Sequence, residues 1–154
     1  MRLLLVEDDP QDIDGLIAQC EVRGWQYRVA HNFLDALRLL SDREAQFHVV
    51  VLDMMLPWGE VPNGITERYT DEEAGLRLFE AMRGVEQGKN IVAELGMPTI
   101  LGRHAQTPVV VLSKIERLEA ACRKLDAVDF LGKGDYRFTK LISRIKCAAQ
   151  AASE

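Results

Sequence analysis

The chain has 154 residues, of which 47% are hydrophobic and 28% charged, and its formal net charge is −5 at pH 7. This size and balance predict one globular domain over residues 1–154, with no effector domain after it. No apolar run approaches the roughly twenty residues of a membrane-spanning helix, and the acidic balance argues against direct DNA binding, which needs a basic face. The first residues lack the long apolar core of a signal peptide, so we expect a cytoplasmic protein.

Short apolar runs, continuous rather than alternating, are typical of strands that are covered on both faces. Four occur, at residues 3–6, 49–52, 109–112 and 128–131, and residues 27–30 are a weaker fifth candidate. Helical spacing of apolar residues fills the gaps, with Pro10 as a first helical residue, Asn32 and Asp71 as N-caps, and further stripes at 118–125 and 138–145. The alternation predicts an α/β fold, a (βα)5 doubly wound parallel five-stranded sheet.

Two connections are longer than the two to six residues that usually join such elements. They comprise residues 58–70 and 86–106, and both contain Gly, Pro and polar residues. Each is either a functional loop or a dispensable surface insertion. We interpret Trp58 and Tyr69, in the first connection, as local packing rather than a recognition surface.

The three cysteines lie far apart and in no metal or redox spacing. Cys20, Cys122 and Cys147 each fall on the apolar face of an expected helix. This placement predicts free thiols that behave as small hydrophobic groups.

Ligands of open α/β sheets bind beyond the carboxyl ends of the strands. In this sequence those positions hold acids, one hydroxyl and one amine: Glu7, Asp8, Asp9, Asp53, Ser113 and Lys133. Crowded carboxylates recruit a cation, and oxygen ligands favour Mg²⁺. A carboxylate can then attack a phosphoryl group while Mg²⁺ and Lys133 neutralise the transferring oxygens and Ser113 donates to one of them.

Five stretches of the sequence carry a family resemblance. They are residues 4–10 (LLVEDDP), 50–57 (VVLDMMLP), 75–79 (GLRLF), 108–113 (PVVVLS) and 129–133 (DFLGK). In this order, and on this strand pattern, they resemble the receiver domain of two-component response regulators. The resemblance spans almost the whole chain apart from the two long connections, and it implies the flavodoxin- or CheY-like form of the fold.

The resemblance implies a role for each matched residue. Asp53 would be the phosphoacceptor, and Glu7 and Asp8 the acidic pair that binds Mg²⁺, Asp8 directly and Glu7 through water. The backbone carbonyl of Met55 would complete the protein ligands. Asp9 would then be a helix cap.

Ser113 matches the residue that carries the switch hydroxyl in the family, and Lys133 matches the family's lysine. Phe130 matches the aromatic residue whose ring moves with the hydroxyl. Two positions depart from the pattern: Gly134 replaces a proline that follows a cis peptide, and Lys114 replaces a small residue. Lys114 could narrow the phosphoryl pocket or add a second cation.

We further expect apolar side chains to control the lifetime of the phosphoryl group. Met55 and Ile115 occupy the two positions that, in receivers, flank the approach of the hydrolytic water, with Lys114 beside them. Neither apolar side chain can orient a water by hydrogen bonding. We expect loss of the phosphoryl group to be about ten-fold slower than with polar side chains at both positions.

The function implied by the resemblance is that of a single-domain response regulator, a phosphoprotein of phosphorelay signal transduction. It would accept the phosphoryl group from a histidine kinase or histidine phosphotransfer protein, form an aspartyl phosphate, and signal to a downstream target through residues 115–148. It would catalyse only its own phosphorylation and dephosphorylation, and is not otherwise an enzyme. A piece of a larger protein would have the same sequence features.

Other functions remain as alternatives. A receiver fold that works as a phosphorylation-independent binding module is one, and Lys114 and Gly134 leave room for it. A phosphatase of the haloacid-dehalogenase type needs an acid where Met55 stands. A flavin- or nucleotide-binding module places Gly, Ser or Thr where residues 7–9 are acidic. The acids after the first strand could instead serve only as helix caps. Asp53 and Lys133 could form an ion pair whose role is purely structural.

Overall fold

Five parallel strands form one sheet at the centre of the computed structural model, which describes residues 1–97, 100, 103–133 and 138–153. The strands lie in the order β2-β1-β3-β4-β5. Their bounds are β1 Arg2–Val6, β2 Gln26–Ala30, β3 Val49–Leu52, β4 Val109–Ser113 and β5 Asp129–Gly132. The predicted doubly wound α/β fold is therefore confirmed, and each expected strand is present with its ends within one residue or so of the prediction.

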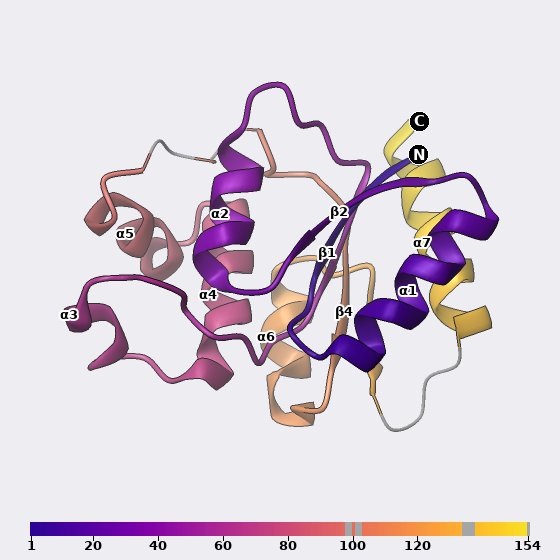
Figure 1. The fold of residues 1–154 in the computed structure, drawn as a ribbon. Helices are drawn as coiled ribbons and strands as arrows, with labels where there is room; N and C mark the ends of the chain where they lie inside the picture. Colours follow the sequence, from indigo (N-terminus) through magenta and orange to yellow (C-terminus); the bar gives the residue numbers. More distant parts are fainter. Residues whose placement is uncertain (98–99, 101–102, 134–137, 154) are drawn as a thin grey trace.

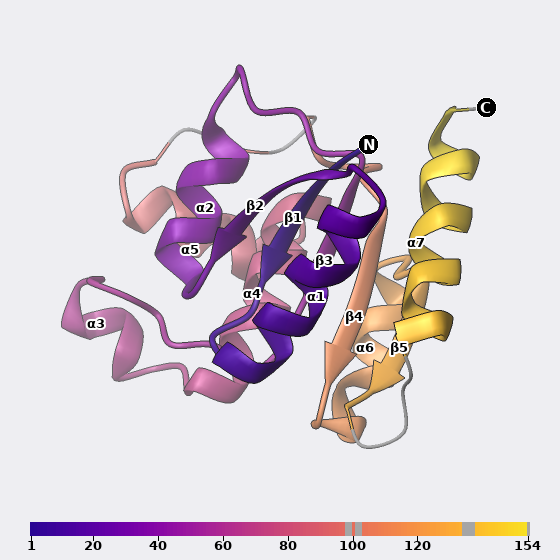
Figure 2. The same cartoon turned by 45° about the vertical axis from the view of Figure 1, so that its right-hand side comes forward.

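Helices cover both faces of the sheet (Figures 1 and 2). One face is covered by α1 (Pro10–Val22) and α7 (Phe138–Ser153). The other is covered by α2 (Phe33–Ser41), α4 (Asp71–Arg83) and α6 (Glu119–Lys124), which follows the 3₁₀ turn η1 (Glu116–Leu118).

Alternate residues of a strand enter opposite cores: Leu4 and Val6 pack with α2 and α4, whereas Leu3 and Leu5 pack with α1 and α7. This explains why the strands read as continuous apolar runs. None of the described helices is long and apolar enough to cross a membrane.

Each long connection contains a helix and packs against the rest of the fold. The first contains α3 (Asn63–Thr66) and the second contains α5 (Glu86–Glu94), which packs on α4. An ion pair between Arg68 and Glu94 joins the two connections. In the second connection, the Arg103 guanidinium and the His104 ring contact backbone carbonyls at the carboxyl end of α2. The connections are thus built into the fold rather than appended to it.

The interpretation of Trp58 and Tyr69 as packing residues is confirmed. Trp58 is buried, its ring centroid lies 4.6 Å from that of Phe33 and 6.0 Å from that of Tyr69, and its indole N–H donates to the carbonyl of Thr70 at 3.1 Å. These contacts fix the path of the chain from β3 into α4.

Two expectations need correction. The N-cap of α4 is Thr70 rather than Asp71, because Thr70 and Glu73 form a capping box in which the Thr70 N–H donates to the Glu73 carboxylate at 3.2 Å. The helix ends at Arg83, and Gly84 caps it with a positive φ of 78°. Cys20 and Cys122 are buried as free thiols, but Cys147 is exposed, because the buried stripe of α7 runs through other positions: Leu141, Ile142, Ile145 and Ala148.

Candidate functional site

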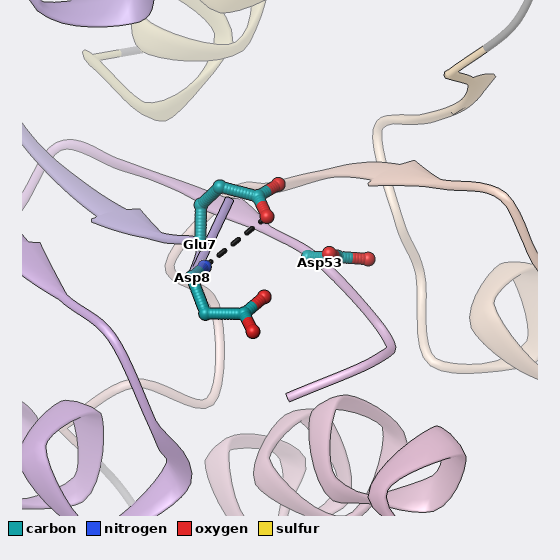
Figure 3. A group of neighbouring side chains, drawn as sticks. All are labelled: Glu7, Asp8 and Asp53. Carbon is teal, nitrogen blue, oxygen red and sulfur yellow. Dashed lines mark hydrogen bonds between the residues drawn. The ribbon is translucent and has the colours of Figure 1, made fainter. Parts of the chain in front are cut away.

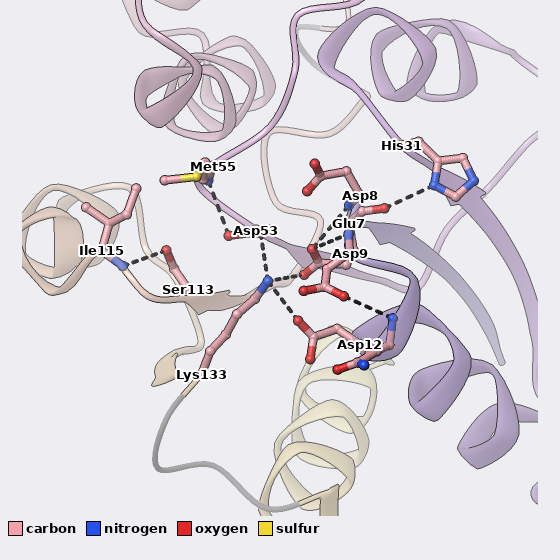
Figure 4. Close-up of polar contacts among 11 residues, drawn as sticks. Glu7, Asp8, Asp9, Asp12, His31, Asp53, Met55, Ser113, Ile115 and Lys133 are labelled. Atoms are coloured by element: carbon pink, nitrogen blue, oxygen red, sulfur yellow. Dashed lines mark hydrogen bonds and ion pairs between the residues drawn. The ribbon is translucent and has the colours of Figure 1, made fainter.

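The parallel register brings the predicted residues to one end of the sheet. Val6 pairs with Leu52, so Glu7 and Asp53 leave adjacent strands side by side, and the Asp53 N–H donates to the carbonyl of Val6 at 3.0 Å. On the other side, the Lys133 N–H donates to the carbonyl of Ser113 at 3.0 Å. Figure 4 shows these side chains converging beyond the strand ends.

The Lys133 ammonium is the centre of the cluster. Its Nζ lies 2.6 Å from Oε2 of Glu7, 2.9 Å from Oδ2 of Asp53 and 3.1 Å from Oδ2 of Asp12. The Lys133 and Asp53 side chains are only 6% and 5% exposed. Asp53, which ends an apolar strand, therefore has the buried partner that a charge in this position requires. Asp12 was not among the residues predicted from the sequence.

Burial and crowding oppose ionisation of the carboxyl groups. Burial raises the pKa of Glu7 to about 7, and the charge of Asp53 adds to this effect while Lys133 opposes it. Burial likewise raises the pKa of Asp53, against the hydrogen bond and charge of Lys133. Burial by itself would lower the pKa of Lys133, but contact with Glu7 and Asp53 outweighs it and raises that pKa. One amine does not balance the acids, so a further cation would stabilise the ionised cluster.

The acids also form a set that fits a metal ion. One carboxylate oxygen from each of Glu7, Asp8 and Asp53 lies within 4.8 Å of the other two (Figure 3). Glu7 and Asp53 are buried, whereas Asp8 is exposed and leaves room for water ligands. An all-oxygen set with an open side suits Mg²⁺, which retains part of its hydration shell.

The neighbouring acidic residues have structural contacts of their own. Oε1 of Glu7 accepts the backbone N–H groups of Asp8 and Asp9, each at 3.1 Å, which holds the turn after β1. Asp9 caps α1 as expected, because its side chain accepts the Gln11 N–H at 3.0 Å. The helix-cap hypothesis is thus confirmed for Asp9, whereas the other carboxylate oxygen of Glu7 contacts Lys133.

A cleft of about 400 Å³ opens over the cluster. Met55 lies at its edge, 44% exposed, and the Met55 N–H donates to Oδ1 of Asp53 at 3.2 Å. The residues that line the cleft are Glu7, Asp8, Asp9, Pro10, Asp53, Met55, Lys114 and Lys133. The cleft is therefore lined by carboxylates and two lysines, and a small anion with a metal ion matches it in charge.

The expected switch residues lie beside the cleft and not in its lining. Ser113 is fully buried, and its hydroxyl oxygen accepts the Ile115 N–H at 3.1 Å. Ile115 and Phe130 are buried as well. Gly134, the other departure from the family pattern, lies outside the described residues.

Gly75 packs against the backbone of Asp53 and Met54. Its N–H donates to the carbonyl of Met54 at 2.9 Å, and a Cβ at this position would lie 2.2 Å from the carbonyl oxygen of Asp53. Gly75 was part of a predicted motif, but its spacing alone did not indicate this close approach.

Comparison with solved structures places the fold. A scan against protein-family models finds no match to the sequence, and neither does a search of curated proteins. The receiver domain of the Francisella response regulator 1452 is similar to this chain, with a TM-score of 0.68 and 20% sequence identity. The alignment covers 97% of each chain. A CheY-like receiver domain protein from Methanospirillum hungatei JF-1 has a TM-score of 0.68 at 17% identity, covering 99% of this chain and 95% of that one.

A third similar structure contains a metal. The receiver domain of the sensor histidine kinase PA1611 from Pseudomonas aeruginosa PAO1 has a TM-score of 0.61 at 16% identity, covering 97% of each chain, and holds a magnesium ion in its active-site cleft. At these identities the similarity shows the fold. The chain has the fold of CheY-like response-regulator receiver domains, as its sequence motifs predicted.

Proposed function

We propose that this chain is a receiver domain that accepts a phosphoryl group on Asp53 and acts as a response regulator. The observation that carries the proposal is the contact of the Lys133 ammonium with Asp53 and Glu7, inside a cleft that Asp8 also lines. A structural ion pair needs one acid and one amine, and it does not account for the excess of carboxylates or for the cleft.

The chemistry follows from the positions of these groups. A carboxylate oxygen of Asp53 attacks the phosphorus of the donor, a P–O bond forms, and the bond to the leaving group breaks with its electron pair. Lys133 stabilises the charge on the transferred oxygens from its place beside Asp53. Glu7, Asp8, Asp53 and the carbonyl of Met55 would hold Mg²⁺, which supplies further neutralisation of these oxygens.

Signalling to other proteins requires a link from Asp53 to the surface. The Ser113 hydroxyl now accepts the Ile115 N–H, and a phosphoryl oxygen would draw the hydroxyl toward Asp53 and release that N–H. The change would pass through Phe130 to the downstream target, by way of residues 115–148, and shift a pre-existing equilibrium. The phosphoryl group would come from a histidine kinase or histidine phosphotransfer protein in the cytoplasm.

The test is labelling with acetyl phosphate and Mg²⁺, followed by intact-protein mass spectrometry. We expect one added phosphoryl group in the wild type, and none in Asp53→Asn or when the metal is chelated. Asp14→Asn, an exposed change on α1, is the control and should label as the wild type does. Labelling that persists in Asp53→Asn would refute the assignment.

The lifetime of the phosphoryl group gives a second test. Of the three residues expected to control the lifetime, Met55 and Lys114 line the cleft and Ile115 does not, so we expect Met55 to keep water from the reacting atoms. Met55→Asn should speed decay about five-fold after the donor is removed, a barrier change of about 1 kcal/mol. Ile115→Val should leave the decay unchanged, and equal decay in Met55→Asn and the wild type would contradict the role of Met55.

A further inference from the structure

Asp12 makes a contact with Lys133 that the proposed chemistry does not yet use. It lies in the first turn of α1, three positions after the N-cap Asp9, so the start of this helix directs its carboxylate toward the end of the sheet. Oδ2 of Asp12 is 3.1 Å from Nζ of Lys133, and the Asp12 side chain is 23% exposed. Figure 4 shows the three carboxylates arranged around the amine.

Three carboxylates compete for the amine in this arrangement. An ammonium group has three N–H donors and no acceptor. Asp53 accepts one of them at 2.9 Å, and Glu7 and Asp12 form ion pairs with the same amine. An oxygen of an incoming phosphoryl group must therefore compete with these carboxylates for Lys133, and it binds most readily where one of the three contacts is given up.

Asp12 is the partner that can be released at the lowest cost. Its contact is the longest of the three, and its side chain is the most exposed, so water can replace the lysine. Glu7 and Asp53 are almost fully buried, and losing the amine would leave either carboxylate desolvated and unpaired.

We propose that Asp12 is a positioning residue that forms an ion pair with Lys133 until a phosphoryl oxygen replaces it. This inference rests on the proposed function and adds a specific exchange of partners to it. Asp12 holds the amine at the Glu7 side of the cleft in the resting state, and the exchange frees its carboxylate to solvent. The residue thereby sets how readily the cleft accepts an anionic donor.

The experiment compares Asp12→Ala with Asp14→Ala, which removes the same charge from an exposed position two residues further along α1. Because Asp12 competes with the donor for Lys133, the KM for acetyl phosphate should fall about five-fold in Asp12→Ala, as expected for a partly exposed ion pair, with kcat little changed. Asp14→Ala should change the KM less than two-fold. Equal effects of the two variants, or slower labelling in Asp12→Ala, would overturn the proposal.

A second readout does not depend on labelling. In the wild type with Mg²⁺, adding beryllofluoride as a phosphoryl analogue should shift the ¹³C signal of the Asp12 carboxylate, while that of Asp14 stays in place. A bound analogue with an unmoved Asp12 signal would overturn the exchange. If acetyl phosphate labels the wild type and Asp12→Ala behaves as Asp14→Ala does, only the role of Asp12 fails. A wild type that neither labels nor binds beryllofluoride removes the proposed function, and the role of Asp12 with it.

Discussion

Replacing Gly75 with alanine should lower the free energy of unfolding by about 3 kcal/mol, at the upper end of the usual cost of overpacking a close contact. The new Cβ would meet the carbonyl oxygen of Asp53 at 2.2 Å and the Cα of Met54 at 2.5 Å. These are backbone atoms at the end of the central strand β3, and they cannot swing aside as a flexible side chain would. Helix α4 would have to move away and stretch the hydrogen bond between the Gly75 N–H and the Met54 carbonyl.

A matched control is present in the same chain. Gly64 lies in α3, and a Cβ there would have no neighbour within 4 Å, so Gly64→Ala should leave stability unchanged or raise it by up to about 1 kcal/mol. Urea denaturation followed by tryptophan fluorescence measures both variants, because Trp58 is buried. If Gly75→Ala proves as stable as Gly64→Ala, α4 is not held against Asp53 and Met54 as tightly as this contact requires. Acetyl phosphate labelling of Gly75→Ala should also slow, since the displaced segment carries Asp53.

The fold was predictable because its signals are local. Each buried strand is a continuous apolar run, since Leu3 and Leu4 serve opposite cores. The cluster of Glu7, Asp53 and Lys133 was predictable for a related reason: parallel strands end at the same edge, so residues just after them meet whatever their separation in the chain.

The features that were missed depend on contacts whose partners the sequence does not identify. Asp12 belongs to the site because its helix starts at a particular angle to β5, which no spacing rule gives. The proximity of Gly75 to the Asp53 carbonyl depends on how closely α4 approaches β3. The junction of the long connections depends on the pairing of Arg68 with Glu94, residues 26 positions apart. Turn and helix-cap rules operate over a few residues and cannot detect such pairs.

Replacing Lys133 with methionine should reduce the rate of acetyl phosphate labelling about a hundred-fold, the usual effect of removing one donor that stabilises developing charge. Methionine retains an unbranched side chain but has no charge and no N–H donor. Among the described residues that line the cleft, the two cations are Lys133 and Lys114, and only Lys133 forms ion pairs with the carboxylates. The transferred oxygens would therefore lose the nearest positive charge of the protein.

The other lysine of the cleft provides the comparison. Lys114→Met removes the same charge from an exposed side chain that has no ion pair among the described residues, so its labelling rate should fall only about three-fold, in the range of a screened surface charge.

The affinity for Mg²⁺ should change in the opposite direction to the labelling rate, with the affinity of Lys133→Met raised. Without the Lys133 ammonium, Glu7 and Asp53 have no buried cation, and Mg²⁺ should bind Lys133→Met more tightly than it binds the wild type or Lys114→Met. Isothermal titration with MgCl₂ measures this affinity. Labelling of Lys133→Met at the rate of Lys114→Met would show that the buried amine only pairs with the acids, and unchanged Mg²⁺ affinity would show that the metal does not share its carboxylates.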